Sequence, residues 1–178
     1  MLLSELIKNI SEYRKKNFED IKIEGISYNS STTQKNDIFI CIRGETSDGH
    51  KYAKAAVDKG AAALFCEEEL DLNVPQIIVK DTKRMMAYIS SAFYGEPSKE
   101  INLIGITGTN GKTTVTHLIQ KISEENGNPC ALIGTLGYKM SSDDSYKDAK
   151  HTTPQPPELQ HDLRIMASGG INTVVMEV

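Results

Sequence analysis

Short apolar runs alternate with amphipathic segments along the whole of this 178-residue chain. Apolar runs typical of strands occupy residues 21–26, 37–42, 61–66, 76–79, 101–106, 130–135 and 171–178. Between several of these runs, as in residues 82–93, apolar side chains recur every three or four positions, which is the period of an amphipathic helix. This alternation predicts an α/β fold with parallel sheets and right-handed crossovers.

Each predicted helix should turn one apolar face toward a sheet. A first helix, capped by Ser4, would use Leu6, Ile7, Ile10 and Tyr13. A later helix would use Val115, Leu118, Ile119 and Ile122. Glycines at 60, 127 and 169–170 are the expected helix stops, and residues 137–150 are expected to form a loop or a hairpin.

The most specific signal is a glycine-rich turn between the apolar run 101–106 and the helix that follows it. Glycines in such a turn let backbone N–H groups close around phosphate oxygens, and the start of the helix adds a favourable dipole. Lys112 would bring a positive charge to the β- and γ-phosphates, and the Thr113 hydroxyl would be a ligand for Mg²⁺. The candidate nucleotide-binding residues are Gly108, Thr109, Asn110, Gly111, Lys112, Thr113 and Thr114.

The spacing of this turn departs from the general phosphate-binding loop, because Ile106 stands where the first glycine is expected. An ordinary glycine-rich turn before a helix is the alternative reading. The intact order of strand, turn and helix favours a nucleotide site, with Lys112 as the catalytic candidate.

Further polar groups stand at the ends of apolar runs. Glu177 ends the last run, and a carboxylate at the tip of a strand beside a phosphate-binding loop would help to hold Mg²⁺. The alternative is a carboxylate that simply leaves the sheet at a strand end. Thr152 and Thr153 precede Pro154, where physical chemistry alone favours helix capping. His151 has no partner at metal-ligand spacing and is expected to be a loop histidine.

Residues 94–100 combine glycine, proline and charge, and they predict a boundary between a domain 1–97 and a domain 98–178. The net charge of −4 argues against a nucleic-acid partner, and no apolar run approaches the roughly 20 residues that span a membrane. The N-terminus lacks the basic region of a signal peptide. Three widely separated cysteines in apolar runs indicate buried, reduced thiols and a cytoplasmic protein.

Taken in order, these motifs resemble the Mur ligase family, whose ATP-dependent members add amino acids to the peptide of the peptidoglycan precursor. The loop at 105–114 resembles that family's ATP loop, including its unusual spacing. A narrower resemblance is to the MurE type, the UDP-N-acetylmuramoyl-dipeptide:amino acid ligases. It depends on Asn29-Ser30, Asp37-Ile-Phe39, Arg43-Gly44, Asp48-Gly-His50, Gly60-Ala-Ala62, Thr152-Thr-Pro154, Leu159-Gln160 and Met176-Glu-Val178.

The resemblance implies a small α/β domain that binds the UDP end of the substrate, followed by the start of a P-loop, parallel-sheet domain that binds ATP. Tyr28 and Ser30, with the segment 45–47 nearby, would bind the uridine nucleotide. His151, Thr152 and Thr153 would contact the muramoyl peptide, in place of helix capping. Thr113 and Glu177 would hold Mg²⁺.

The implied activity is ATP-dependent addition of diaminopimelate or lysine to UDP-MurNAc-L-Ala-D-Glu through an acyl phosphate. The partners would be that UDP-linked dipeptide and a free amino acid. Departures from the family pattern are Ser31 for an Arg, His151 for an Asn and Gln155 for a Glu. The chain stops inside an apolar run, so we expect a fragment that is inactive alone. The alternatives are a folylpolyglutamate or cyanophycin synthetase type of ligase, or a nucleotide-binding module without catalysis.

Overall fold

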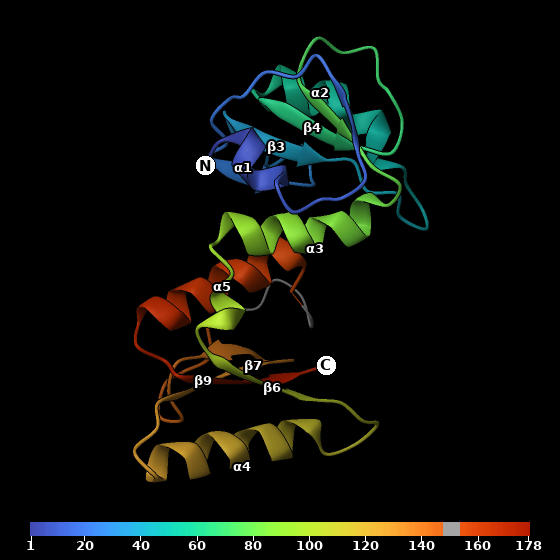
Figure 1. Cartoon of the computed structure of the whole chain (residues 1–178). Coiled ribbons are helices and arrows are strands. Elements are labelled where there is room, and N and C mark those ends of the chain that lie inside the picture. Colours follow the sequence, from blue (N-terminus) through green and yellow to red (C-terminus); the bar gives the residue numbers. More distant parts are fainter. Residues whose placement is uncertain (148–153) are drawn as a thin grey trace. The chain divides into compact units, whose positions relative to one another are not determined.

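The structure, a computed structural model, describes residues 1–147 and 154–178. It divides into two compact units, Met1–Phe93 and Tyr94–Val178, whereas the sequence places the boundary between 97 and 98. Each unit is a sheet with helices on both faces (Figure 1). The predicted α/β fold built on parallel strands is therefore confirmed.

The first unit contains a five-stranded sheet in the order β1-β5-β4-β3-β2. Its strands are β1 Arg14–Lys16, β2 Gly25–Ser27, β3 Asp37–Ile40, β4 Ala63–Cys66 and β5 Gln76–Ile78. Strands β2 to β5 are parallel to one another, and β1 pairs with β5 in the antiparallel direction. The carboxyl ends of the four parallel strands consequently meet at one edge of the sheet.

Helices cover both faces of this sheet. Helices α1, Leu3–Ile7, and α3, Thr82–Phe93, contribute to one buried cluster with β3 and β5. The short helix η1, Gly49–Tyr52, leads into α2, Ala53–Asp58, which packs on the opposite face. Gly60 follows α2 with a φ of +106°, a left-handed conformation that suits the glycine expected at this helix stop.

The prediction of a first helix that starts at Ser4 and continues to Tyr13 is wrong. Helix α1 ends at Ile7, and the basic segment beyond Tyr13 is the edge strand β1. Leu2 precedes the helix, and the Ser4 hydroxyl donates to Asp20 Oδ2 at 2.8 Å instead of capping. Short helices have little stability of their own, so tertiary pairing with β5 decides the conformation of this segment.

The second unit contains a four-stranded sheet in the order β6-β9-β7-β8. Its strands are β6 Asn102–Ile106, β7 Cys130–Gly134, β8 Gly137–Lys139 and β9 Thr173–Glu177. Strands β6, β9 and β7 are parallel, and β8 pairs with β7 in the antiparallel direction. Residues 137–150 are expected to form a loop or a hairpin, and in their described part Tyr138 forms an antiparallel bridge with Lys147. A short helix η2, Pro97–Lys99, precedes β6.

Two long helices lie on opposite faces of this sheet (Figure 1): α4, Lys112–Glu125, and α5, Pro156–Ser168. Arg164 of α5 anchors the segment before β6, because its guanidinium donates to the carbonyls of Tyr94 and Gly95 and to Glu100. Helix α5 ends before Gly169 and α4 before Asn126, as predicted.

The predicted inward face of α4 is wrong. Thr116 and Gln120 are buried against the sheet, and Gln120 Nε2 donates to the Cys130 carbonyl at 2.9 Å. Three of the four apolar residues expected to face the core are exposed: Val115, Leu118 and Ile122. In the described residues, the side of α4 that carries these three residues faces away from the sheet, whereas the fourth, Ile119, packs against a buried cluster of the sheet.

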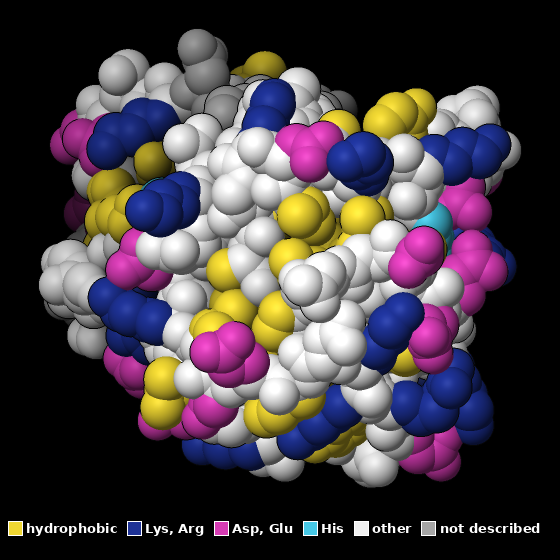
Figure 2. Space-filling model, turned by 90° about the horizontal axis from the view of Figure 1, so that it is seen from above, with side chains coloured by type: hydrophobic (Ala, Val, Ile, Leu, Met, Phe, Trp, Pro, Cys, Tyr) yellow, Lys and Arg dark blue, Asp and Glu magenta, His cyan; other side chains and the backbone are white. Residues whose placement is uncertain are grey.

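The three cysteines are free and buried, as expected. Burial raises the pKa of each thiol, to about 12 for Cys66. In the part of the chain that the structure describes, no helix is long and apolar enough to cross a membrane. Positive and negative side chains are interspersed on the face drawn in Figure 2, and that face carries no extended basic surface.

Candidate functional site

The glycine-rich loop lies at the edge of the second sheet where its three parallel strands end. Ile106, the last residue of β6, pairs with Glu177, the last residue of β9. The loop leaves β6 at this point, and α4 begins at Lys112 directly after it. The predicted nucleotide-binding residues and Glu177 thus share one edge of one sheet.

Two glycines of the loop have positive backbone φ angles. Gly108 and Gly111 have φ angles of +143° and +79°, which L side chains rarely adopt. A Cβ at Gly111 would meet nothing within 4 Å, so the conformation, and not lack of space, requires glycine there. Lys112 Nζ donates to the Gly108 carbonyl at 2.7 Å and therefore lies back over the loop. The first-turn N–H groups of α4 point out of the helix toward the same place.

Glu177 is aimed across the end of β7. Its Oε2 accepts a hydrogen bond of 2.9 Å from the Thr135 hydroxyl, which follows β7. A Cβ on Gly134 would come within 2.8 Å of Glu177 Oε1, so the absence of a side chain at 134 leaves room for this carboxylate. Sequence reasoning did not identify Gly134 and Thr135, which are far from Glu177 along the chain.

A second series of hydrogen bonds supports the first turn of α4. His117 Nδ1 lies 2.7 Å from the Thr113 carbonyl, and its Nε2 lies 2.6 Å from the Tyr146 hydroxyl. A carbonyl only accepts, so Nδ1 carries the proton and Nε2 accepts from the tyrosine. Burial raises the pKa of Tyr146, which keeps the hydroxyl protonated as this bond requires. Helical spacing alone could have shown that His117 reaches Thr113.

These groups fit a magnesium-bound polyphosphate. The turn offers backbone N–H groups and one ammonium group to phosphate oxygens, while Glu177 and the Thr113 hydroxyl offer oxygen ligands to a hard cation. A divalent cation would offset the repulsion between the carboxylate and the phosphates. The charges present at the sheet edge therefore suit a nucleotide with its metal.

The candidate uridine-binding residues lie in the first unit, in the turn after β2. Asn29 Oδ1 accepts from both the N–H and the hydroxyl of Ser31, which fixes the backbone around Ser30. Lys59 Nζ donates to the Ser31 carbonyl at 2.7 Å, which brings a positive charge to this turn. Tyr28 is half-buried against the core of the unit.

The structure brings together the loop residues and Glu177 in the second unit, and it places Tyr28 and Ser30 at the strand ends of the first unit. The remaining predicted substrate contacts, His151, Thr152 and Thr153, lie outside the described residues.

Two family models match the chain. A model described as the Mur ligase family, catalytic domain, matches residues 22–94, and the Mur ligase middle domain matches residues 106–178. Together they account for most of both structural units.

Curated relatives extend this similarity to nearly the whole chain. A UDP-N-acetylmuramoyl-L-alanyl-D-glutamate–2,6-diaminopimelate ligase of Bacillus licheniformis is 45% identical over 172 residues, covering 97% of this chain and 34% of the relative. The ligase of the same name from Listeria monocytogenes is 44% identical over 178 residues, covering 100% of this chain and 36% of the relative. The chain thus spans about a third of the length of these relatives.

Solved structures agree with the fold. The structure of a ligase with that same name superposes with a TM-score of 0.80 at 26% identity, covering 100% of this chain and 36% of the other. MurF ligase from Thermotoga maritima in complex with ADP has a TM-score of 0.55 at 17% identity, covering 86% of this chain and 31% of the other, a likeness of fold alone.

Proposed function

This chain belongs to the Mur ligase family, and from that premise we propose that the full-length protein is an ATP-dependent amide ligase of the MurE type. It would add the third amino acid to UDP-MurNAc-L-Ala-D-Glu in peptidoglycan precursor synthesis. Similarity over 97% of the chain to relatives named for this reaction carries the proposal. Those relatives are named for 2,6-diaminopimelate, which favours it over lysine as the added amino acid.

The reaction joins a carboxylate to an amine, and a carboxylate is a poor electrophile until it gains a leaving group. The dipeptide carboxylate attacks the γ-phosphate of ATP, which gives an acyl phosphate and releases ADP. The amine of the incoming amino acid then displaces phosphate and forms the amide. Both steps depend mainly on positioning and on stabilising charge at the transferring phosphoryl group.

The second unit would bind the nucleotide through its own backbone and side chains. N–H groups of the loop 108–114 would hold the phosphates, and Lys112 would exchange its bond to the Gly108 carbonyl for phosphate oxygens. Thr113 and Glu177 would bind Mg²⁺, and Thr135 would orient the Glu177 carboxylate. Magnesium, when bound, supplies neutralisation of charge on the phosphates.

The first unit would bind the uridine end of the substrate. Tyr28, Ser30 and the segment 45–47 follow neighbouring parallel strands, β2 and β3, at the edge where ligands of open α/β sheets bind. His151, Thr152 and Thr153 would contact the muramoyl peptide. Since ATP and UDP-linked precursors are the substrates, we place the enzyme in the cytoplasm.

The test is substitution of Lys112 in the full-length protein. Lys112→Ala should reduce ligation of diaminopimelate to UDP-MurNAc-L-Ala-D-Glu by at least about a thousand-fold, because one preorganised charge at the reacting group is worth about that much in rate. Formation of ADP and of the UDP-tripeptide is measured together. The matched control is Lys121→Ala, which removes an exposed ammonium of α4 that pairs with Glu125.

Ligation by Lys112→Ala at the wild-type rate would contradict the assignment of the loop. Turnover of folate or cyanophycin substrates by the wild-type protein, without turnover of the UDP-linked dipeptide, would replace the proposal with the related type of ligase. Tight ATP binding without any amide product would instead leave a nucleotide-binding module.

A further inference from the structure

A short hairpin projects from the carboxyl end of β3 in the first unit. The Gly49 N–H donates to the Ile42 carbonyl at 2.8 Å, and Arg43 pairs with Asp48 in an isolated antiparallel bridge. A Cβ on Gly49 would lie 2.6 Å from the Ile42 nitrogen, so only glycine permits this close approach of the two arms. The tip, residues 45–47, is exposed.

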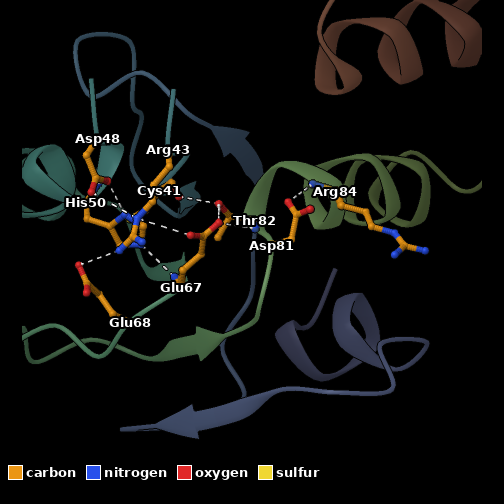
Figure 3. A network of polar contacts seen from close by, with 9 residues as sticks. All are labelled: Cys41, Arg43, Asp48, His50, Glu67, Glu68, Asp81, Thr82 and Arg84. Atoms are coloured by element: carbon orange, nitrogen blue, oxygen red, sulfur yellow. Dashed lines mark hydrogen bonds and ion pairs between the residues drawn. The ribbon is translucent and has the colours of Figure 1, made fainter. Parts of the chain in front are cut away.

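A buried histidine holds the base of this hairpin. His50 Nδ1 lies 2.6 Å from Asp48 Oδ1, and its Nε2 accepts the Glu67 N–H at 2.9 Å (Figure 3). Since Nε2 accepts, the ring is neutral and Nδ1 donates to Asp48. The side chain of His50 is only 3% exposed, so the ring joins the hairpin to the end of β4 while almost completely shielded from solvent.

Arg43 occupies the space among three carboxylates at the same base. Its Nε lies 3.4 Å from Asp48 and 3.5 Å from Glu67, and its Nη2 lies 3.2 Å from Glu68. Asp48, His50 and Glu68 lie close enough together to suggest a metal site. Both ring nitrogens are already hydrogen-bonded, and the guanidinium supplies the cation, so the cluster is an internal brace and not a site for metal.

The brace continues to the start of α3. Glu67 Oε1 accepts the Thr82 N–H at 3.0 Å, and the Thr82 hydroxyl lies 2.7 Å from the Cys41 carbonyl just beyond β3. Figure 3 shows these side chains converging from the hairpin, from the end of β4 and from the first turn of α3. The hairpin is therefore tied directly to the end of β4 and, through Glu67, to the start of α3.

We propose that Arg43 and the Asp48–His50 pair are positioning residues that hold the hairpin tip, residues 45–47, ready for the uridine end of the substrate. This inference rests on the proposed function, which places the tip beside the uridine nucleotide. None of the three side chains needs to touch the substrate. They act by removing conformations of the tip that binding would otherwise have to exclude, which lowers the entropic cost of binding.

The test compares KM and kcat in the full-length enzyme. Arg43→Gln should raise KM for the UDP-linked dipeptide about ten-fold or more, while kcat and the KM for ATP stay within about two-fold, because only binding at the uridine end is affected. Arg43 carries this test because its side chain is 48% exposed, and the variant should fold. Arg43→Lys keeps the charge without the planar fork and should restore part of the affinity.

The matched control is Lys54→Gln, which removes an exposed ion pair with Asp58 on α2 of the same unit. It should leave all kinetic constants unchanged. A second variant, His50→Ala, leaves the Glu67 N–H without its acceptor, so it should lower thermal stability and also raise the same KM. The unfolding midpoint of each variant is measured beside its kinetics.

The outcomes separate the two proposals. If wild-type enzyme does not use the UDP-linked dipeptide, the proposed function fails. If it does, and Arg43→Gln lowers the unfolding midpoint without changing that KM, the brace is merely structural and the inference fails. Equal increases in KM for ATP and for the dipeptide would also overturn it, because a local effect on the hairpin tip cannot reach both.

Discussion

At the scale of single residues, Gly134 determines where the Glu177 carboxylate can lie. A methyl group at 134 would come within 2.8 Å of Glu177 Oε1, and the carboxylate is the far end of a flexible side chain. We expect the backbone of β7 to stay in place and the Glu177 carboxylate to move. That movement would break the 2.9 Å bond from Thr135 and would displace the oxygen proposed to bind Mg²⁺.

We therefore expect Gly134→Ala in the full-length enzyme to raise the Mg²⁺ concentration needed for half-maximal rate about ten-fold, the scale of effect seen when groups that orient metal ligands are lost. Glu177→Gln should raise it further. Steady-state rates over a Mg²⁺ titration measure both. Glu125→Gln, at an exposed carboxylate on α4, is the control. An unchanged Mg²⁺ dependence in Glu177→Gln would remove Glu177 from the metal site.

The candidate site could be predicted only where its chemistry is local in sequence. The loop and Glu177 could be predicted because an apolar run followed directly by glycines, or by a carboxylate, can be recognised within a short stretch of sequence. Thr135 and Tyr146 were not, because their partners Glu177 and His117 are 42 and 29 residues away. Their roles depend on strand order and on a hairpin register that one sequence does not specify.

At the scale of elements, α4 presents an apolar stripe to solvent in the described residues. Leu118 and Ile122 are 56% and 61% exposed, and Val115 on the same side of the helix is 42% exposed. Exposed apolar patches of this kind usually mark surfaces that another part of a protein covers. The relatives are about three times as long as this chain, so such a covering part is available in them.

The double variant Leu118→Gln/Ile122→Gln should show whether the apolar stripe of α4 is covered in the full-length protein. In residues 1–178, it should change the free energy of unfolding by no more than about 0.5 kcal/mol, as surface substitutions usually do. In the full-length protein, we expect a loss of about 2 kcal/mol or more, because two apolar side chains would lose their buried surroundings. Denaturant unfolding measures both changes.

The control is Leu132→Ala in β7, a fully buried side chain whose truncation should cost about 2–5 kcal/mol in either protein. Equal tolerance of the double variant in both proteins would show that the stripe stays exposed in the longer chain.

Helices and strands could be predicted from the sequence where a pattern of apolar side chains marks them. The spacing of apolar residues in α4 predicts a helix correctly. It does not predict which face of the helix packs on the sheet, because that depends on which other elements surround the helix. Strand β1 is three basic residues held by backbone pairing with β5, so no apolar pattern marks it. The strands β3, β4, β5 and β7 are buried along their length, and the sequence identifies them because nearly all of their residues are apolar or small.

At the scale of the whole molecule, the chain has two units with separate cores. The buried clusters of the first unit contain only residues before 94, and those of the second contain only residues after it. Each unit also carries its own proposed nucleotide site, the uridine site at the ends of β2 and β3 and the ATP site at the ends of β6 and β9. Ligand binding to either unit should therefore stabilise that unit through its own equilibrium.

This separation predicts a pattern of amide hydrogen exchange. UDP should slow exchange in the first unit, and ADP with Mg²⁺ should slow it in the second, by up to about 2.7 kcal/mol of local opening free energy at a ligand concentration of 100 times Kd. Lys112→Ala should abolish the ADP effect and leave the UDP effect intact. Arg43→Gln should weaken the UDP effect and leave the ADP effect intact.

General destabilisation of the protein would not produce this result, in which each variant loses protection by one ligand only. It would weaken protection by both ligands together. Protection of the second unit by UDP alone, or loss of both effects in either variant, would contradict the assignment of one nucleotide site to each unit. Because each variant serves as the control for the other, the experiment tests the two sites separately, without requiring turnover.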